Sequence, residues 1–493
     1  MTGMPLRQLL DGVCEIASAL AEVRVAAMTL DSRKVTPGSA FVALAGATTH
    51  GLQHADEALA RGAACVLVEA AVGSKIDLPS LAVEVPSLRR QLGAIADRFY
   101  AQPSARLTVI GVTGTNGKTS TVQMLAQALQ SGAYGPAGSL GTLGMDFGGE
   151  RRGGERTTPD VISVHAALAE LGELGARAVA MEVSSHALDQ GRVDAVAFDI
   201  AVFSNLTRDH LDYHGDMASY GAAKAKLFAW STLRAAVINI DDAFGHDLSE
   251  RLPDGLDSWT FSAAGNRDAR LYAEHLRCDG HGLSFELIEA GSRHFVRSGL
   301  LGRFNVENLL AVAGCLRALD YPLSQVVERL AALSPVNGRM NRIQAADTAP
   351  LVVVDYAHTP DALSQALASL RAHTAGKILC VFGCGGERDR GKRPQMAQAV
   401  EQGADVAILT DDNPRGEDGE QIIRDTLAGF ARPETVRVER DRARAIALAL
   451  GKAKLGDTVL IAGKGHETYQ EVNGEKRDFD DAGCARHWLQ VHA

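Results

Sequence analysis

A glycine-rich stretch in the first quarter of the chain carries the residue types that bind phosphate. Thr113-Gly-Thr-Asn-Gly-Lys-Thr-Ser120 follows an apolar run at 107–112 and precedes apolar residues at helical spacing. Glycines let backbone N–H groups approach an anion, and the following helix N-terminus attracts negative charge. Lys118 can reach the β and γ phosphates, and the Thr119 hydroxyl can ligate Mg²⁺. We therefore expect a nucleoside triphosphate site formed by Gly114, Thr115, Asn116, Gly117, Lys118, Thr119 and Ser120.

The stretch departs from the strict phosphate-loop pattern. Val112 stands where G-x-x-x-x-G-K-[ST] has its first glycine. The alternative is a glycine turn without a ligand. Gly-Lys-Thr directly between a predicted strand and a predicted helix favours the phosphate interpretation.

An acidic and an imidazole side chain follow two further predicted strands. Glu182 lies in a strand at 178–186 that ends in polar residues, and His210 lies near the end of the stretch 198–212. Working groups in open parallel sheets sit beyond the carboxyl ends of the strands. We therefore expect both to face the nucleotide. Hard oxygen ligands such as Glu182 and Thr119 suit Mg²⁺, whereas His210 alone is also typical of a structural histidine.

Two candidate binding sites near residue 385 have weaker support in the sequence. Gly383-Cys-Gly-Gly386 lacks the G-x-G-x-x-G spacing of a dinucleotide site, and the basic run Arg388 to Arg393 favours an anion clamp over a solvated charged loop. Cys380 and Cys384 have no second pair, and Cys380 lies in an apolar strand, so no metal is expected there.

These residues require a scaffold in which strands and helices alternate, which predicts an α/β fold with parallel sheets. Strands are expected at 40–45, 64–68, 351–355, 378–383, 406–410 and 459–462, with helices at 54–61 and from Asn305 as N-cap. A length of 493 residues suggests about three domains. We place them at 1–105 (a small α/β binding domain), 106–336 (the phosphate-loop domain) and 337–493 (a Rossmann-like domain).

Composition excludes several classes of protein. A net charge of −10 argues against nucleic-acid binding, and no apolar run is long enough for membrane insertion. The N-terminal residues lack the pattern of a signal peptide, and seven scattered cysteines are typical of a reducing compartment. We expect a cytoplasmic monomer.

Six motifs occur together and in order: Thr113-Gly-Thr-Asn-Gly-Lys-Thr119, Glu182-Val-Ser-Ser-His186, Ser204-Asn-Leu-Thr-Arg-Asp-His-Leu-Asp212, Asn308, Asn337-Gly-Arg339 and Asp355-Tyr-Ala-His-Thr-Pro360. With them the whole chain resembles the Mur ligase superfamily. The resemblance implies a UDP-binding domain, an ATPase domain and a Rossmann-like amino-acid domain. It also implies an ATP-dependent ligase that builds the peptidoglycan precursor.

Asp412-Asn-Pro-Arg415 resembles the signature of superfamily members that add meso-2,6-diaminopimelate to UDP-N-acetylmuramoyl-L-alanyl-D-glutamate. A plain Asn-Pro turn is the alternative. The chemistry favours the signature, because diaminopimelate is lysine plus a carboxylate, which a guanidinium binds in bidentate fashion.

The resemblance assigns the remaining residues to three substrates. The diaminopimelate site would comprise Arg388, Asp412, Asn413, Pro414, Arg415, Gly463 and Glu467. The UDP substrate would contact Leu30, Ser32, Ala47, Thr48, Thr49, Thr157, Thr158, Ser184, Gln190 and Arg192. For ATP, Asn308 would face adenine, Asp355 the ribose and Arg339 the phosphates.

The resemblance further implies a mechanism through an acyl phosphate. Lys118, Arg339 and two Mg²⁺ ions would neutralise charge, with Glu182 beside them. Lys224, in Tyr220-Gly-Ala-Ala-Lys224, matches a carbamylated lysine that would hold the second Mg²⁺ with His210, whereas Lys226 is the nearby alternative. Carbamylation requires a depressed lysine pKa.

Other functions remain open on sequence alone. A lysine-adding relative or a folylpolyglutamate synthase belongs to the same superfamily. A GTPase switch is disfavoured because no Asn or Thr is followed by Lys, as the guanine motif requires, although Asp146-Phe-Gly-Gly149 fits D-x-x-G. A dinucleotide oxidoreductase is disfavoured because its glycine fingerprint is missing.

Overall fold

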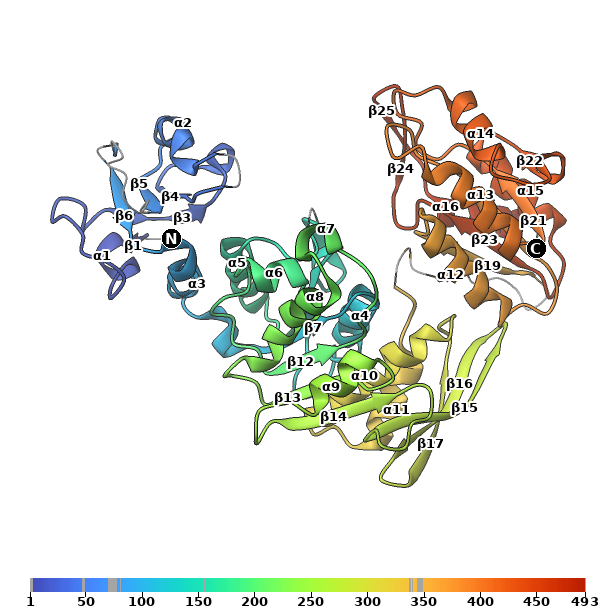
Figure 1. Cartoon of the computed structure of the whole chain (residues 1–493), viewed down its shortest axis with the longest axis horizontal. Coiled ribbons are helices and arrows are strands. Elements are labelled where there is room, and N and C mark those ends of the chain that lie inside the picture. The colour runs from blue at the N-terminus through green and yellow to red at the C-terminus, as the bar shows by residue number, and fades with distance from the viewer. Residues whose placement is uncertain are drawn as a thin grey trace. The chain divides into compact units, whose positions relative to one another are not determined.

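The computed structural model describes residues 3–46, 49–69, 78–79, 81–154, 156–336, 338, 340–343 and 349–492. The chain divides into two compact units, Met1–Phe261 and Ser262–Ala493, which Figure 1 colours from blue to green and from yellow-green to red. Both units are mixed α/β with parallel sheets, as predicted. Among the described residues, no helix combines the length and the apolar character that crossing a membrane requires.

The first unit begins with a small parallel sheet. Its strand order is β3 (Ala27–Thr29), β4 (Ser39–Ala43), β5 (Cys65–Glu69) and β6 (Ala82–Val85). Alternate residues along β4 and β5 face opposite sides, which is the period of a strand. Phe41 and Val66 pack with α2 (Ala55–Ala60), whereas Val42 and Leu67 pack with α3 (Leu88–Phe99). The predicted helix at 54–61 and the strands at 40–45 and 64–68 are therefore confirmed to within two residues.

The larger sheet of the first unit places the phosphate loop at its centre. Its order is β10 (Glu150–Arg152), β9 (Gly144–Phe147), β8 (Ala137–Gly141), β11 (Ala178–Glu182), β7 (Thr108–Thr113), β12 (Ile200–Phe203), β13 (Ala235–Asn239) and β14 (Asp257–Ser262). Strands β8, β11, β7, β12, β13 and β14 are parallel. Since β7 lies between β11 and β12, the three segments that sequence analysis selected end side by side.

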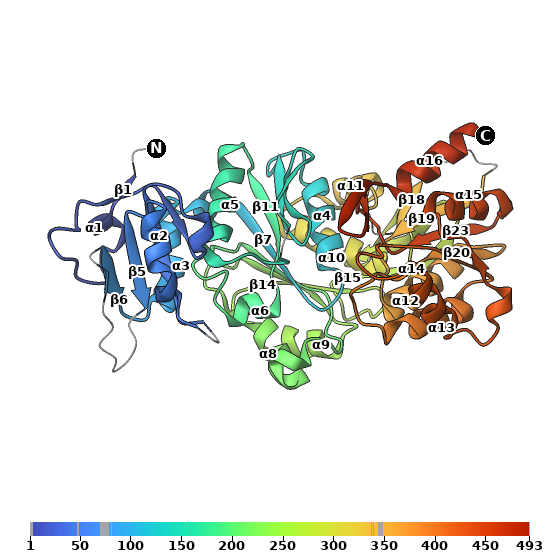
Figure 2. The ribbon, with the colours of Figure 1, turned by 90° about the horizontal axis from the view of Figure 1, so that it is seen from above.

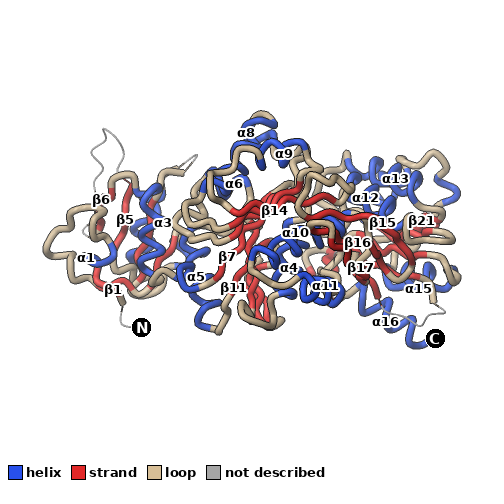
Figure 3. Tube along the Cα trace, turned by 90° about the horizontal axis from the view of Figure 1, so that it is seen from below, coloured by secondary structure: helices blue, strands red, loops and turns tan. Residues whose placement is uncertain are grey.

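The second unit begins with an antiparallel meander of β15 (Leu271–Asp279), β16 (Gly282–Glu289) and β17 (Ser292–Ser298). Helices α10 (Phe304–Ala318) and α11 (Leu323–Ala332) lie against these strands (Figure 3). The prediction that Asn305 caps α10 is wrong. Arg303 occupies the N-cap, and Asn305 is buried inside the first turn, where its side chain donates to the Leu301 carbonyl at 2.7 Å.

The rest of the second unit is a helix–sheet–helix layer. The sheet order is β18 (Asn341–Ile343), β19 (Leu351–Asp355), β23 (Thr458–Ala462), β20 (Ile378–Phe382), β21 (Val406–Leu409) and β22 (Arg437–Val438), and only β18 is antiparallel. Helices α12 (Pro360–Arg371), α13 (Lys392–Gly403) and α14 (Gly419–Leu427) cover one face. Helices α15 (Arg442–Lys452) and α16 (Asp481–Val491) cover the other (Figure 2). The four strands predicted here are confirmed.

Candidate functional site

The phosphate loop joins β7 to α4 (Lys118–Ala128) in a backbone conformation that requires glycine. Gly114 has a φ of 145°, and a Cβ built on it would lie 1.9 Å from Ser204 Oγ. Gly117 has a φ of 84° directly before the first residue of α4. Lys118 Nζ donates to the carbonyls of Gly114 and Thr115 at 2.9 Å each. The loop therefore has the strand–turn–helix context that anion binding needs.

The segment after β12 is hydrogen-bonded to this loop. These contacts were not predicted from the sequence. Asn116 N donates to Asn205 Oδ1 at 2.9 Å, and Thr115 N donates to the Asn205 carbonyl at 2.8 Å. Ser204 Oγ donates to the Asn116 carbonyl at 2.6 Å. The motif that begins at Ser204 thus fixes the shape of the nucleotide loop.

Glu182 lies beside the first residues of α4, as the magnesium hypothesis requires. Its side chain is buried, and its Oε1 accepts from Thr119 Oγ1 at 3.0 Å and from Thr142 N at 2.8 Å. Burial raises the pKa of the Glu182 carboxyl, and the charge of Lys118 acts in the opposite direction. Thr142 is a contact that sequence analysis missed, because nothing in a strand-to-strand turn marks it as functional.

Lys224 lies near the end of α8 (Met217–Ala225) with its amine directed into the phosphate loop. The residue is 1% exposed, and Nζ donates to the Gly114 carbonyl at 2.8 Å. Nζ also lies 4.3 Å from the centre of the Tyr220 ring. Burial, with the charge of Lys118 as the second cause, lowers the pKa of Lys224 to about 6. By contrast, Lys226 is half exposed and pairs with Asp189 at 2.8 Å.

His210 belongs to an aromatic cluster beside these groups. It has a φ of 53° and directly precedes α7 (Leu211–His214). Its ring centre lies 4.8 Å from that of His186 and 6.2 Å from that of Tyr220. Because Tyr220 also contacts Lys224 and hydrogen-bonds Thr115 at 3.1 Å, the structure brings His210 and Lys224 to the same side of the loop.

Five residues predicted to contact the UDP substrate form one hydrogen-bonded group. Thr158 Oγ1 donates to the Glu182 carbonyl at 2.8 Å and accepts from Ser184 N at 3.1 Å. Arg192 donates to the Thr158 carbonyl and to Gln190 Oε1, each at 3.0 Å. Thr157 accepts from Thr142 Oγ1 at 3.2 Å, which links the group to the acidic end of β11.

The other predicted UDP contacts lie in the small sheet region. Ser32 is buried, and its Oγ donates to Glu57 Oε2 at 2.8 Å. Leu30 is half-buried beside the core that α3 covers. The Thr49 carbonyl accepts from Gly46 N at 2.8 Å. Ala47 and Thr48 lie outside the described residues.

The remaining predicted ATP contacts lie in the second unit. Asn308 is buried on α10, and its Nδ2 donates to Asn305 Oδ1 at 2.9 Å. Asp355 ends β19, and its carboxylate accepts from Met340 N at 2.6 Å and from Ala357 N at 2.8 Å. Arg339 lies outside the described residues.

The Asp412–Arg415 turn lies beyond the carboxyl end of β21. Arg415 has a φ of 55°, and a backbone bridge to Val472 joins it to the hairpin of β24 (Tyr469–Val472) and β25 (Glu475–Asp478). Its Nη1 donates to the Gly386 carbonyl at 2.8 Å, and its Nε lies 3.6 Å from Glu471 Oε2. A non-glycine residue in the left-handed region costs about 1–3 kcal/mol and often marks a functional site.

The loop after β20 packs against this turn. Gly386 N donates to the Asn413 carbonyl at 2.9 Å, and a Cβ on Gly386 would lie 1.9 Å from the Pro414 carbonyl oxygen. Exposed Arg388 follows this loop. Gly463 has a φ of 119°, and its N donates to the Asp355 carbonyl at 3.0 Å.

The anion-clamp interpretation of the run Arg388 to Arg393 is wrong for Arg393. Arg393 is fully buried and pairs with Glu417 at 2.7 Å and Asp425 at 2.8 Å. Arg390 also pairs with Glu417, at 2.7 Å. The Arg393 guanidinium is already neutralised by carboxylates that lie more than twenty residues away in the sequence, whereas Arg390 is 69% exposed.

Lys464 is the clearest residue that sequence analysis missed. Its side chain is 0% exposed, and Nζ donates to Asn413 Oδ1 at 2.7 Å and lies 3.2 Å from Asp412 Oδ1. Burial lowers the pKa of Lys464, and the Asp412 carboxylate opposes this. Its position between Gly463 and Gly465 was the only signal in the sequence.

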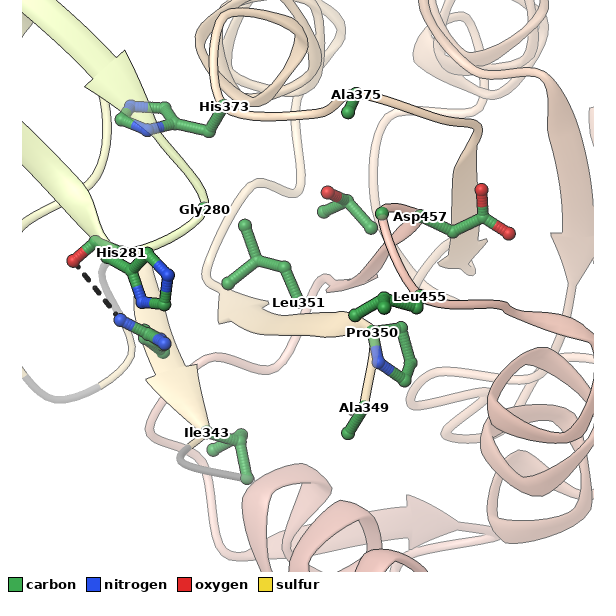
Figure 4. Close-up of a pocket in the computed structure, with 13 residues that line it drawn as sticks. Gly280, His281, Ile343, Ala349, Pro350, Leu351, His373, Ala375, Leu455 and Asp457 are labelled. Carbon is green, nitrogen blue, oxygen red and sulfur yellow. Dashed lines mark hydrogen bonds between the residues drawn. The ribbon is translucent and has the colours of Figure 1, made fainter. Parts of the chain in front are cut away.

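A pocket in the second unit lies at the amino ends of strands β19 and β23 (Figure 4). Leu351 and Thr458, the first residues of β19 and β23, line it together with His281, Arg342 and His373. None of the residues predicted to bind a substrate lines this pocket, and Asp355 and Gly463 lie at the opposite, carboxyl ends of β19 and β23.

Comparison with known proteins identifies relatives along nearly the whole chain. Family models match at residues 24–100 (Mur ligase family, catalytic domain), 112–316 (Mur ligase middle domain) and 338–465 (Mur ligase, glutamate ligase domain). The UDP-N-acetylmuramoyl-L-alanyl-D-glutamate–2,6-diaminopimelate ligase of Xanthomonas campestris pv. campestris strain 8004 is 58% identical over 487 residues, which cover 99% of this chain and 97% of the relative. The ligase of the same name from Pseudomonas putida is 48% identical over 504 residues and covers 100% of both chains.

Solved structures agree with this result. A ligase of the same name is 37% identical, with a TM-score of 0.75 over 100% of this chain and 99% of that chain. MurF from Acinetobacter baumannii is 21% identical, with a TM-score of 0.63 over 94% of this chain and 96% of that chain, and shares the fold.

Proposed function

The chain belongs to the Mur ligase family, and on that basis we propose that it is the ATP-dependent ligase that adds meso-2,6-diaminopimelate to UDP-N-acetylmuramoyl-L-alanyl-D-glutamate. The reaction belongs to cytoplasmic peptidoglycan precursor synthesis. Relatives of this name at 58% and 48% identity over nearly the full chain carry the proposal. The left-handed Arg415 turn supports the choice of amino acid.

The reaction joins a carboxylate to an amine and needs activation by ATP. The γ-carboxylate of the D-glutamate attacks the γ-phosphorus, and ADP leaves as the acyl phosphate forms. The amine of diaminopimelate then attacks the acyl carbon, loses a proton and expels phosphate. Several anions must come together, so positioning and charge neutralisation dominate the rate enhancement. Lys118, at the start of α4, and Arg339 would contribute positive charge.

Mg²⁺ fits the donor set beside the phosphate loop. The buried Glu182 carboxylate is hydrogen-bonded to the Thr119 hydroxyl, and both offer hard oxygen ligands. Glu182 and Thr119 would hold one ion, while His210 and a carbamate on Lys224 would hold a second. Bound Mg²⁺ neutralises the charge of the phosphates.

Carbamylation of Lys224 is supported by its surroundings. Only the neutral amine attacks CO₂, and it releases a proton as the N–C bond forms. A pKa of about 6 leaves most of the amine neutral at pH 7, whereas an ordinary lysine is almost fully protonated. The exposed Lys226 is already paired with Asp189 and lacks this environment.

Recognition of diaminopimelate would rest on the turn Asp412–Arg415 together with Arg388, Gly463 and Glu467. The Arg415 side chain is 19% exposed and is held by the Gly386 carbonyl and Glu471. A guanidinium fixed in this way is pre-organised for the distal carboxylate that lysine lacks. With lysine bound, the partly buried Arg415 would face no distal carboxylate, which would strengthen discrimination against lysine.

We assign the three functions to the three segments predicted from the sequence. Residues 1–105 would bind the UDP moiety through Leu30, Ser32 and the loop at 47–49, and residues 106–336 would bind ATP. Residues 337–493 would bind the amino acid. The hydrogen bonds that link Thr158 and Ser184 to the end of β11 support placing the substrate's D-glutamate near the phosphate loop.

Phosphate release from ATP tests the proposal directly. The purified chain is assayed with the UDP-dipeptide and with diaminopimelate, lysine or glutamate in turn. We expect release to depend on both the UDP-dipeptide and diaminopimelate, with the product confirmed by its mass. Equal turnover with lysine would refute the assigned amino acid, and turnover with a folate and glutamate would indicate folylpolyglutamate synthesis.

A further inference from the structure

A fully buried ammonium lies directly behind the proposed amino-acid site. Lys464 follows β23, and its side chain is 0% exposed, although lysine is almost never buried without partners. Nζ donates to Asn413 Oδ1 at 2.7 Å and to the Tyr469 carbonyl at 2.8 Å, and it lies 3.2 Å from Asp412 Oδ1. The three donors of the ammonium therefore point at the turn and at strand β24.

These contacts determine which way the Asn413 amide faces. Asn413 Oδ1 accepts from Lys464 Nζ and also from Glu471 N at 3.0 Å. A flipped amide would direct its own N–H groups at these two donors, which is repulsive. The Nδ2 group must therefore face the other way, where it donates to Glu467 Oε2 at 3.0 Å.

Glu467 is thereby held in one position. Glu467 belongs to the proposed diaminopimelate site, where a carboxylate is suited to pair with an ammonium group of the amino acid. It lies 4.0 Å from Lys464 Nζ. Since Nζ has its own partners, the lysine acts on Glu467 mainly through Asn413.

We propose that Lys464 is a positioning residue of the amino-acid site, whose ammonium orients the Asn413 amide so that Asn413 presents Glu467 to the ammonium group of the incoming diamino acid. The inference rests on the proposed function. It adds a residue that contacts no substrate, so its loss should weaken the binding of one substrate selectively.

Steady-state kinetics of Lys464→Met test this role. Methionine keeps the length of the side chain but removes the charge and the donors. We expect the KM for diaminopimelate to rise at least about tenfold, which corresponds to the loss of a charge-assisted hydrogen bond. The KM for ATP and for the UDP-dipeptide should change less than about twofold, and kcat less than about threefold, because the phosphate loop is untouched.

Lys476→Met is the matched control. Lys476 lies on the neighbouring strand β25 with Nζ 4.3 Å from the centre of the Tyr469 ring, so it contacts the same hairpin without contacting Asn413. Its KM for diaminopimelate should stay at the wild-type value.

The outcomes separate the inference from the proposed function. If the wild-type protein does not use diaminopimelate, the proposed function itself is refuted. If wild type uses it, an unchanged KM in folded Lys464→Met, or a fall in kcat with no selective rise in that KM, overturns the positioning role. Should Lys464→Met not fold in a thermal melt, Lys464→Gln replaces the charge-assisted bond to Asn413 with a neutral one. A smaller but still selective rise in the KM for diaminopimelate then supports the role, and an unchanged KM overturns it.

Discussion

At the scale of single residues, one buried lysine lies beside the phosphate loop and another beside the proposed amino-acid site, but the two lysines have different partners. Lys224 donates to one carbonyl and, among the residues that the structure describes, has no carboxylate within salt-bridge distance, and its pKa falls to about 6. Lys464 is equally buried but lies 3.2 Å from the Asp412 carboxylate. A desolvated amine without an ion pair suits reaction with CO₂, whereas a paired ammonium suits a structural charge.

We predict that Lys224→Ala lowers the rate of phosphate release by about a hundredfold or more, because one anionic ligand is lost. Added acetate should restore part of the rate in this variant. Wild-type activity should fall as the pH drops below about 6, where the amine becomes protonated and cannot form a carbamate. Lys226→Ala is the control and should keep most of the activity. An unmodified mass for Lys224 together with no rescue by acetate would contradict the role.

Arg415→Ala should reduce the preference for diaminopimelate over lysine by about tenfold to a hundredfold, the contribution of a charge-assisted hydrogen bond. The ratio of kcat/KM for the two amino acids measures it. Arg424→Ala is a suitable control, since Arg424 is 58% exposed on the neighbouring helix α14. A preference that survives the loss of Arg415 would contradict the assigned specificity.

At the scale of elements, the phosphate loop depends on strand order. Because β12 is the neighbour of β7, Ser204 and Asn205 are in reach of the loop backbone. Gly114 must approach Ser204 so closely that no side chain fits between them. The loop is thus shaped jointly by two strand ends that are about 90 residues apart in the sequence.

Gly114→Ala should therefore abolish nucleotide binding and lower the free energy of unfolding by about 1–3 kcal/mol, through overpacking and backbone strain. Gly172→Ala is the contrasting variant. Gly172 lies on α5 (Val161–Glu173), and an added Cβ would have its nearest neighbour at 4.0 Å. Alanine there should raise stability by about 0.5–1 kcal/mol. Urea unfolding and ADP titration of both variants measure the two effects.

At the scale of the whole molecule, one histidine connects several elements of the second unit. His373 follows α12, and its Nε2 accepts from Gly302 N at 2.8 Å, just before α10. Its Nδ1 donates to the Asp279 carbonyl at 2.7 Å, at the end of β15. The acceptor role of Nε2 requires a neutral ring, so protonation would break the contact with Gly302.

Burial lowers the pKa of His373 in the folded chain below the ordinary value of 6.5. Between that folded value and 6.5, the unfolded chain binds more protons, so stability is full above pH 6.5 and is lost as the pH falls. We predict that the urea midpoint of the wild-type protein falls between pH 7.5 and pH 5.5, and that the midpoint of His373→Asn falls less over the same range. His281→Asn, at an exposed histidine of the same pocket, should behave as wild type. An equal pH dependence in all three proteins would contradict this role.

Much of the fold follows from local patterns. The α/β class and the strands at 351–355 and 378–382 were predictable because apolar runs between helices bury both faces of a parallel strand. The phosphate loop was predictable because its glycines, lysine and threonine are contiguous. Asn305 was predicted wrongly as a helix cap, since α10 begins at Phe304, one residue before Asn305, and this places Asn305 inside the first turn.

The sequence by itself determined the chemistry available to this protein: a phosphate loop, carboxylates beyond strand ends, and an Asp-Asn-Pro-Arg turn. Only the tertiary structure decided which charged side chains are already paired or hydrogen-bonded within the protein. It paired Arg393 with Glu417 and Asp425, buried Lys224 against Gly114, and placed Lys464 behind Asn413. The reason is physical: a charge acquires its pKa and its partners from groups that are distant in the chain, and the packing of strands and helices brings those groups together.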